Sequence, residues 1–275
     1  MGVFFIRKDV IPSMFTKFIY DSISSDEFGI LCVKFGSPES IITAPSEQSD
    51  LKLEKAASGH LFQIASQEYA NPLQYTLQVM NKNQSPITQE EERALKKWLV
   101  QRGRFKPFCI YDKYYSDIWF FANINNPKQI SINGVYGLEF TVTTNSPFGY
   151  SDLREFRYEL NQGDAFDIYV NTDEPIPIRP DLEIAVKEAG TLILTNTAMG
   201  GDSKNALIIE NVSPGEVIAI QGGYPKIRTS KPEHPIYEDF NLVWPTLADD
   251  WNPFTINISC TLSMSFREIR KVGIV

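Results

Sequence analysis

The chain has 275 residues, of which 43% are hydrophobic and 12% aromatic, so it can fill the cores of two ordinary domains and lacks the composition of a disordered chain. No apolar run approaches the roughly 20 residues that span a bilayer, and the start MGVFFIRKDVIPSMF has neither a basic leading region nor a small-residue cleavage site. We therefore expect a protein that is made and folded in a cytosol, with no membrane partner.

The formal net charge of −8 is unevenly distributed along the chain. Residues 1–150 carry 15 Lys/Arg and 15 Asp/Glu, whereas residues 151–275 carry 11 and 19 and so account for the whole net charge. Proteins that bind nucleic-acid phosphates depend on clustered cations. The charge pattern therefore does not indicate a basic nucleic-acid groove.

The first 150 residues carry the signals of a mainly β domain with one helix. Residues 72–80 (PLQYTLQVM) alternate polar and apolar side chains, which is typical of a half-buried strand. Thr88 is followed three residues later by Glu91, the spacing of a helix capping box, and Trp98 falls on the apolar face of that helix. We expect the helix at about 89–102, and strands at Phe15–Tyr20, Gly29–Phe35, Gln74–Met80, Phe108–Tyr111, Trp119–Asn123 and Leu138–Thr144.

A polar stretch, SPESIITAPSEQSDLKLEKAAS, occupies residues 37–58 and contains one short alternating section. Long polar excursions inside compact domains are uncommon and are often functional. Two interpretations stay open: an ordinary exposed loop, or a segment with a role in binding.

The pattern changes at residues 147–152, where Pro147, Gly149 and the polar pair Ser151-Asp152 favour a boundary. We therefore predict domains at 1–150 and 151–275. The second half has short strands, Gly-rich turns and no convincing helix, which is typical of a β-sandwich or jelly roll. Its strands are expected at Asp167–Val170, Leu182–Lys187, Thr191–Asn196, Ala206–Ile209, Val217–Ile220, Phe254–Ser259 and Thr261–Ile269.

Two tryptophans of the second half, Trp244 and Trp251, are candidate carbohydrate-binding residues, because an exposed aromatic face can bury the apolar side of a sugar ring. The competing interpretation places both in the core, where tryptophan is usually well buried. The nearby Asp249-Asp250 pair and Pro253 predict a turn before the next strand.

No catalytic, cofactor-binding or metal site is predicted. The chain has only two histidines, His60 and His234, and they offer neither a zinc-ligand spacing nor a base for a nucleophile. A glycosidase needs two carboxylates that face each other across a cleft, whereas neighbouring loop carboxylates are usually solvated. The three cysteines are far apart in apolar runs and are expected to be reduced and buried. These cysteines are Cys32, Cys109 and Cys260; the carboxylate pairs considered are Asp173/Glu174, Asp181/Glu183 and Asp249/Asp250.

The order of these elements resembles the phage distal tail proteins, the Dit hub of siphovirus tails. At the start of the chain, the resemblance rests on FIYDSISSDEFGILCVKFGS at residues 18–37 and on the strand, capped helix and aromatic strand pair between Tyr69 and Tyr150. At the end of the chain it rests on DFNLVWPTLADDWNPFTINIS at 239–259 and SMSFREIRKVGIV at 263–275. No single motif is diagnostic, and the order of the segments carries the resemblance.

This resemblance implies a mainly β protein: an N-terminal split β-barrel-like or β-sandwich domain with one α-helix, and a C-terminal galectin-like or jelly-roll β-sandwich. It implies a homo-hexameric ring whose N-terminal domains surround a channel through which DNA passes without specific binding. The implied partners are the tail-tube protein, a tail-associated lysin or tail fibre protein, and a receptor-binding protein. The implied location is the tail tip of the virion, after synthesis in the bacterial host cytoplasm.

Within such a ring, we expect the strands Gln74–Met80 and Leu138–Thr144 to help build the inner wall and segment 37–58 to be the intersubunit arm. Arg267, Arg270 and Lys271 are expected to pair with acidic groups around them.

Two other functions stay open. A carbohydrate-binding adhesion module that acts through the C-terminal β-sandwich would need an exposed aromatic platform near Trp244 or Trp251. A tail-associated hydrolase would need a cleft with two facing carboxylates.

Overall fold

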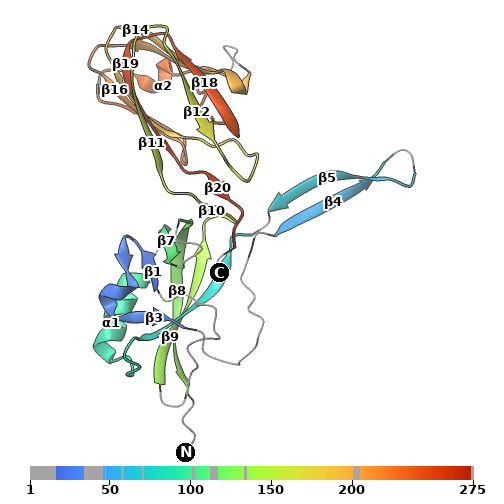
Figure 1. Ribbon diagram of the computed structural model, residues 1–275. Helices are drawn as coiled ribbons and strands as arrows, with labels where there is room; N and C mark the ends of the chain where they lie inside the picture. The colour runs from blue at the N-terminus through green and yellow to red at the C-terminus, as the bar shows by residue number, and fades with distance from the viewer. Residues whose placement is uncertain are drawn as a thin grey trace, which may run out of the picture. The chain divides into compact units, whose positions relative to one another are not determined.

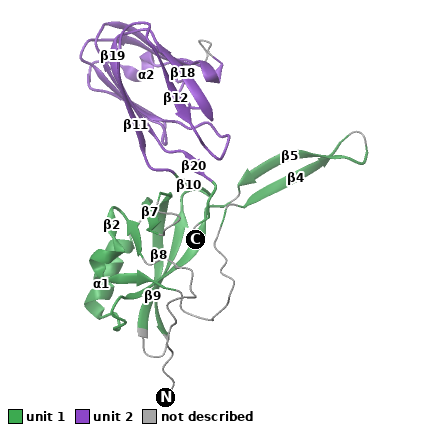
Figure 2. Ribbon diagram, viewed as in Figure 1, with its two compact units in different colours: residues 1–150, 271–275 green, residues 151–270 purple. Residues whose placement is uncertain are grey.

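The computed structural model describes residues 17–33, 46, 48–56, 59–69, 71–100, 103–111, 117–132, 135–200 and 205–273 (Figure 1). The fold is mainly β, as predicted, with a single helix of more than four residues among the described segments. The chain divides into two compact units, Met1–Tyr150 with Lys271–Val275, and Ser151–Arg270 (Figure 2). The division into domains at 1–150 and 151–275 stays a prediction.

Unit 1 is built on one antiparallel sheet with the strand order β2-β1-β7-β8-β9-β6-β3, and β10 lies beside β8. The long hairpin of β8 and β9 forms its middle, and a register shift between Asn125 and Lys128 marks an irregularity in that pairing. The elements are β1 Lys17–Tyr20, β2 Ile23–Ser24, the 3-10 helix η1 Ser25–Phe28, β3 Ile30–Cys32, β6 Gln74–Asn81, α1 Gln89–Leu99, β7 Lys106–Tyr111, β8 Trp119–Ile132, β9 Val135–Thr144 and β10 Gly149–Tyr150.

Helix α1 begins as the sequence predicts. The Thr88 side chain accepts a hydrogen bond from the Glu91 backbone N–H at 3.3 Å, and the Glu91 carboxylate accepts one from the Thr88 backbone N–H at 2.7 Å. These bonds satisfy two N–H groups that a helix start otherwise leaves without partners. The helix ends at Leu99, earlier than expected, and the predicted end at Arg102 lies outside the described residues.

Trp98 packs α1 against the sheet, and the residue is only 6% exposed. Its ring stacks on Phe18 and Phe28, with centroid distances of 5.5 and 4.4 Å, and its indole N–H donates to the Tyr20 carbonyl at 3.1 Å. The core interpretation of Trp98 is therefore confirmed.

Unit 2 is a sandwich of two antiparallel sheets, with orders β11-β19-β13-β16-β17 and β12-β18-β14-β15. One buried apolar cluster draws side chains from both sheets, so the expected β-sandwich is confirmed. Its elements are β11 Arg154–Leu160, β12 Ala165–Val170, β13 Asp181–Val186, β14 Gly190–Asn196, the 3-10 helix η2 Thr197–Met199, β15 Leu207–Val212, β16 Val217–Gln221, β17 Lys226–Thr229, α2 Ile236–Asp239, β18 Asp250–Ile256, β19 Cys260–Phe266 and β20 Ile269–Arg270.

The turn predicted at Asp249–Pro253 is wrong, because β18 begins at Asp250 and Pro253 stands within it, opposite Asp167. A proline lacks the N–H that a strand with neighbours on both sides would use. Here β14 pairs with β18 only from Phe254 onwards, so the strand tolerates Pro253. In unit 2, the sequence analysis did not predict the strands β11 and β17 or the one-turn helix α2.

A buried carboxylate holds the two ends of unit 2 together. Glu268 is 4% exposed and accepts hydrogen bonds from Arg154, from Arg270 Nη2 at 2.6 Å and from the Asn171 backbone N–H at 3.1 Å. Burial raises the pKa of Glu268, but these donors outweigh it and hold the pKa below the ordinary 4.5. Arg270 thus has an acidic partner, as predicted. Arg267 donates to the Ser151 carbonyl at 2.7 Å and interacts electrostatically with the Asp152 carboxylate.

Replacing Trp98 by Ala should lower the free energy of unfolding by about 4 kcal/mol, because it leaves a large cavity between α1 and the sheet. Chemical denaturation measures this change. Trp251→Ala is the matched control, since that side chain is 59% exposed and should cost far less. Equal losses in the two variants would contradict the packing described for Trp98.

Replacing Glu268 by Gln should cost about 3 kcal/mol at pH 7, because Arg154 and Arg270 lose their buried counter-charge. A carboxylate with a lowered folded-state pKa stabilises the fold above its ordinary pKa, and that stability is lost as the pH falls through the folded-state value. The difference in unfolding free energy between the wild type and Glu268→Gln should therefore become smaller below pH 4.5. Urea unfolding at pH 7 and pH 3 tests this, with the exposed Glu159→Gln as a control; a difference that widens in acid would contradict it.

Candidate functional site

A separate two-stranded sheet interrupts unit 1. Strands β4 (Ser49–Lys55) and β5 (Phe62–Tyr69) pair only with each other and form an antiparallel hairpin (Figure 1). Part of the polar stretch 37–58 is therefore a strand, and its interpretation as an ordinary loop is wrong for Ser49–Lys55. Residues 37–45, 47, 57 and 58 of that stretch lie outside the described residues.

One face of the hairpin is mostly apolar, and the other is polar and charged. Cross-strand pairs share a face, so Leu53 lies beside Ile64 and, on the next pair, Glu54 lies beside Gln63 on the opposite face. We call the apolar face the one that carries Leu51, Leu53, Phe62 and Ile64, which are 51%, 54%, 65% and 62% exposed. Two polar side chains share this face, Lys55 opposite Phe62 and Gln67 opposite Leu51. The opposite face carries Asp50, Lys52, Glu54, Gln63, Ser66 and Glu68.

This apolar face is a candidate interaction surface. An isolated two-stranded hairpin is marginally stable in water, and a contiguous exposed apolar patch marks an interaction surface. Scattered exposed leucines would need no such explanation, but four large side chains on one ribbon face do.

The two strands predicted for the inner wall, β6 and β9, are neighbours, and β8 continues the same surface. Many of their outward side chains are amides and hydroxyls, in cross-strand pairs such as Gln74 with Thr143 and Thr76 with Thr141. Apolar side chains, Met80, Trp119 and Phe121, occupy the ends of the same rows. The carboxylate of this surface, Glu139, accepts from Gln78 at 2.9 Å and pairs with Lys128 at 3.4 Å. We call this surface the polar face, defined by Gln74, Thr76, Gln78, Asn123, Asn125, Lys128, Glu139, Thr141 and Thr143. It carries one ion pair and otherwise uncharged groups.

The two candidate tryptophans of unit 2 differ in their surroundings. Trp244 is partly buried against the core, and its ring centroid lies 5.0 Å from that of Phe240 with the two planes nearly perpendicular, so it is less accessible as a platform than Trp251. Trp251 is 59% exposed, and its ring lies 5.2 Å from that of Tyr169. The core interpretation is therefore wrong for Trp251.

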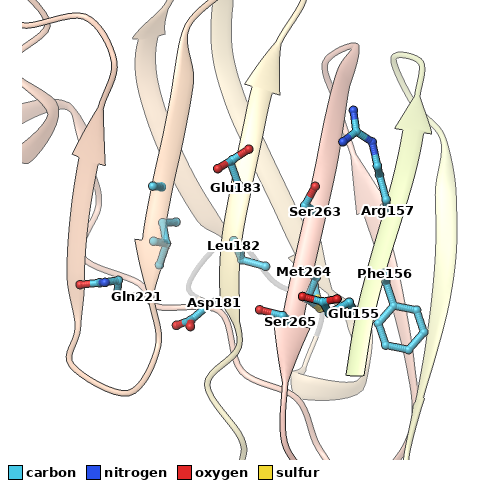
Figure 3. Close-up of a pocket in the computed structure, with 12 residues that line it drawn as sticks. Glu155, Phe156, Arg157, Asp181, Leu182, Glu183, Gln221, Ser263, Met264 and Ser265 are labelled. Carbon is cyan, nitrogen blue, oxygen red and sulfur yellow. The ribbon is translucent and has the colours of Figure 1, made fainter. Parts of the chain in front are cut away.

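Asp181 and Glu183 line a shallow hollow of about 520 Å³ on the outside of the five-stranded sheet, together with Glu155 and Arg157 (Figure 3). The first two stand on one face of one strand, so their side chains do not face each other across a cleft. Asp181 also accepts a hydrogen bond from the Gly222 N–H at 2.7 Å, which is a structural role. This hollow gives the hydrolase alternative no support.

Asp249 and Asp173 have structural partners as well: Asp249 accepts from the Thr172 N–H at 3.0 Å, and Asp173 lies 4.0 Å from Arg270. Among the described residues, no group of three or more His, Cys, Asp or Glu side chains has the arrangement of a metal site.

His234 belongs to a buried cluster that sequence reasoning did not find. Its Nδ1 lies 2.6 Å from the Glu216 carboxylate and its Nε2 lies 3.1 Å from that of Asp239. Burial raises the pKa of Glu216, but hydrogen bonds from Thr229, His234 and Ser213 hold it below its ordinary value. Both ring nitrogens of His234 have carboxylate partners, so the side chain links α2 to the turn before β16. Its role is structural, and neither nitrogen is left to activate a nucleophile.

The three cysteines are free and buried, as expected. Burial raises the pKa of the Cys260 thiol to about 11, so this group stays protonated and unreactive near neutral pH. Burial also raises the pKa of Cys32. Among the described residues, no helix has the length and apolar character needed to cross a membrane.

Two family models match consecutive parts of the sequence. One is described as the phage tail protein N-terminal domain and matches residues 14–146; the other is described as the phage tail C-terminal domain and matches residues 148–266. These matches define the class of the protein, a structural component of a phage tail. The chain belongs to this family of phage tail proteins, which confirms the resemblance seen in the sequence. Proteins with curated descriptions include no significant match.

Solved phage structures share the fold. The crystal structure of the Dit protein (gp 19.1) of phage SPP1, described as a paradigm of the hub adsorption apparatus in phages that infect Gram-positive bacteria, matches with a TM-score of 0.62 and 10% identity, covering 93% of this chain and 99% of that one. A chain of the phage P2 baseplate in its activated conformation with Ca matches at 0.53 and 9% identity, covering 90% and 92%. The form with Sr matches at 0.55 and 8%, covering 91% and 97%.

Proposed function

We propose that this phage tail protein is the distal tail hub of a long-tailed bacteriophage or prophage. Six copies close into a ring that joins the tail tube to the tail-tip and receptor-binding apparatus and lets DNA pass. The observation that carries this proposal is the uncovered apolar face of the β4–β5 hairpin. The shared fold with SPP1 Dit supports it.

A second copy of the chain is the occupant that best accounts for the hairpin. A head-to-tail contact uses two different surfaces of each subunit and forms a ring when its rotation closes. The hairpin is one such surface. Phe105, Tyr111 and Tyr136 of unit 1 are 46%, 44% and 50% exposed and are candidates for the surface that receives it. Covering Leu51, Leu53, Phe62 and Ile64 would then remove apolar area from water in every subunit.

The polar face suits the wall of a DNA channel. Clustered cations would bind phosphates and hold the genome, whereas uncharged amides and hydroxyls offer it no strong site. The equal numbers of Lys/Arg and Asp/Glu in residues 1–150 agree with that role. The proposed partners are the tail-tube protein, a tail-associated lysin or tail fibre protein, and a receptor-binding protein, at the tail tip of the virion.

Replacing Leu53 and Ile64 together by Ser should weaken self-association at least ~10-fold, because two large apolar side chains leave the contact. Light scattering and negative-stain microscopy measure the result, and the wild type should have about six times the subunit mass of 31.2 kDa. The matched control is Glu54→Ser with Gln63→Ser, the adjacent pair on the charged face. A wild type that stays monomeric at its highest attainable concentration, or an apolar-face variant with unchanged mass, would contradict the proposal.

Introducing Thr141→Cys tests the position of the polar face within the ring. The native Cys32, Cys109 and Cys260 are buried, so the new thiol should dominate labelling. In the assembled ring, a small maleimide should react with it while a maleimide on a folded carrier protein should be excluded from the channel. The same thiol in the Leu53→Ser/Ile64→Ser background should react with both reagents. Equal labelling by both reagents in the intact ring would place this face on the outside.

A further inference from the structure

We propose that the exposed pair Trp251 and Tyr169 on unit 2 is a binding site for a neutral saccharide. This inference concerns a different surface from the proposed ring contact and does not depend on the ring.

The pair is built into the four-stranded sheet. Tyr169 of β12 and Trp251 of β18 are direct cross-strand partners, and the next residues on each strand, Val170, Ile168 and Asn252, are buried on the inner side. Both rings therefore stand on the outer face, where they are 44% and 59% exposed. This position follows from the strand geometry, because successive side chains of a strand point to opposite faces of the sheet.

Adjacent exposed aromatic rings differ from single exposed apolar residues, which are common on protein surfaces. The two ring centroids are 5.2 Å apart, and their planes meet at 54°. Pro253 follows on the same face of β18 and adds a further exposed apolar group.

Hydrogen bonds hold the backbone on either side of Trp251. Asn252, which is 0% exposed, accepts from the Asn196 side chain at 2.9 Å and from the Ala248 N–H at 2.8 Å, and donates to the carbonyls of Ala248 and Asp250 at 2.9 and 3.0 Å. Asp249 ties the same segment to Thr172, just after β12. A site that is already ordered loses less entropy when it binds a ligand.

The chemistry of the surroundings selects the ligand. Asp167 is exposed on the same face of β12 as Tyr169, two residues before it, and its carboxylate is an acceptor for hydroxyl groups. A pyranose offers an apolar C–H face to the aromatic rings and hydroxyls to this carboxylate. Residues 151–275 carry 19 Asp/Glu against 11 Lys/Arg, so a phosphorylated or sulfated glycan would be repelled. A neutral saccharide fits both features.

The test is saturation-transfer NMR on the full chain with three soluble probes: tetrasaccharides of glucose, of galactose and of N-acetylglucosamine. At least one should receive saturation at its C–H protons, and Trp251→Ala should weaken its binding at least ~10-fold. Trp251→Phe should retain part of the affinity, because a ring face remains. Tyr224→Ala, which removes an aromatic side chain that is 82% exposed elsewhere on unit 2, is the matched control and should leave binding unchanged.

The proposal is overturned if none of the three probes binds the wild type, or if Trp251→Ala binds as the wild type does. Acrylamide quenching of Trp251 fluorescence, read as the difference between wild type and Trp251→Phe, addresses the rival occupant. Quenching that falls as the protein concentration rises would assign the pair to a protein contact and would also overturn the saccharide site. Loss of the ring in the Leu53→Ser/Ile64→Ser variant would leave saccharide binding intact, so the two proposals fail separately.

Discussion

A β-strand points successive side chains to opposite sides of its sheet, and both units of this protein depend on that constraint. Every strand that contributes to a core also presents a second row of side chains outside it. In unit 1 the second row of β6, β9 and β8 is the polar face. In unit 2 the second row of β12 and β18 carries Tyr169 and Trp251. The surfaces assigned to function are therefore the reverse sides of the strands that stabilise the fold.

The β4–β5 hairpin obeys the same alternation but has no core on either side. Its apolar row is left uncovered by the residues that the structure describes, whereas the corresponding rows of unit 2 close on each other across the sandwich. The difference explains why association with another chain is assigned to the hairpin. The buried carboxylates of unit 2 are stabilised by hydrogen bonds. Glu268 and Glu216 each accept from several donors and thereby join segments of unit 2.

Much of the fold could be predicted because the signals are local. The Thr88 and Glu91 capping box marks the start of α1, and the alternation in PLQYTLQVM marks β6. Strand β4 carries a similar signal, since Leu51 and Leu53 alternate with charged residues, but the polar composition around them left both a loop and a binding segment open. Strand β11 was missed because Arg154, Glu155, Arg157 and Glu159 give its sequence, REFRYEL, a polar character. As an edge strand with one face in water, it needs few apolar side chains.

The candidate sites were less predictable because their parts are distant in the sequence. Trp251 meets Tyr169 across 82 positions of the chain, and only the register of β12 and β18 brings them together. Local composition predicted Pro253 to lie in a turn. Strand β18 can contain this proline because β14 does not pair with β18 at Pro253, and only the tertiary structure shows that. His234 gives no spacing signal at all, because Glu216 lies 18 residues before it and becomes its partner only through the folding of the β16–β17 hairpin.

The register irregularity in the β4–β5 hairpin, between Lys52 and Leu53, has a consequence for solubility. A ribbon of two strands has unpaired N–H and C=O groups along both of its margins, and such margins readily recruit further strands into fibrils. A bulge bends and twists one strand, so flat ribbons cannot stack in register against it. Together with the lysines and glutamates that flank the bulge, this distortion disfavours the stacking of one hairpin on another.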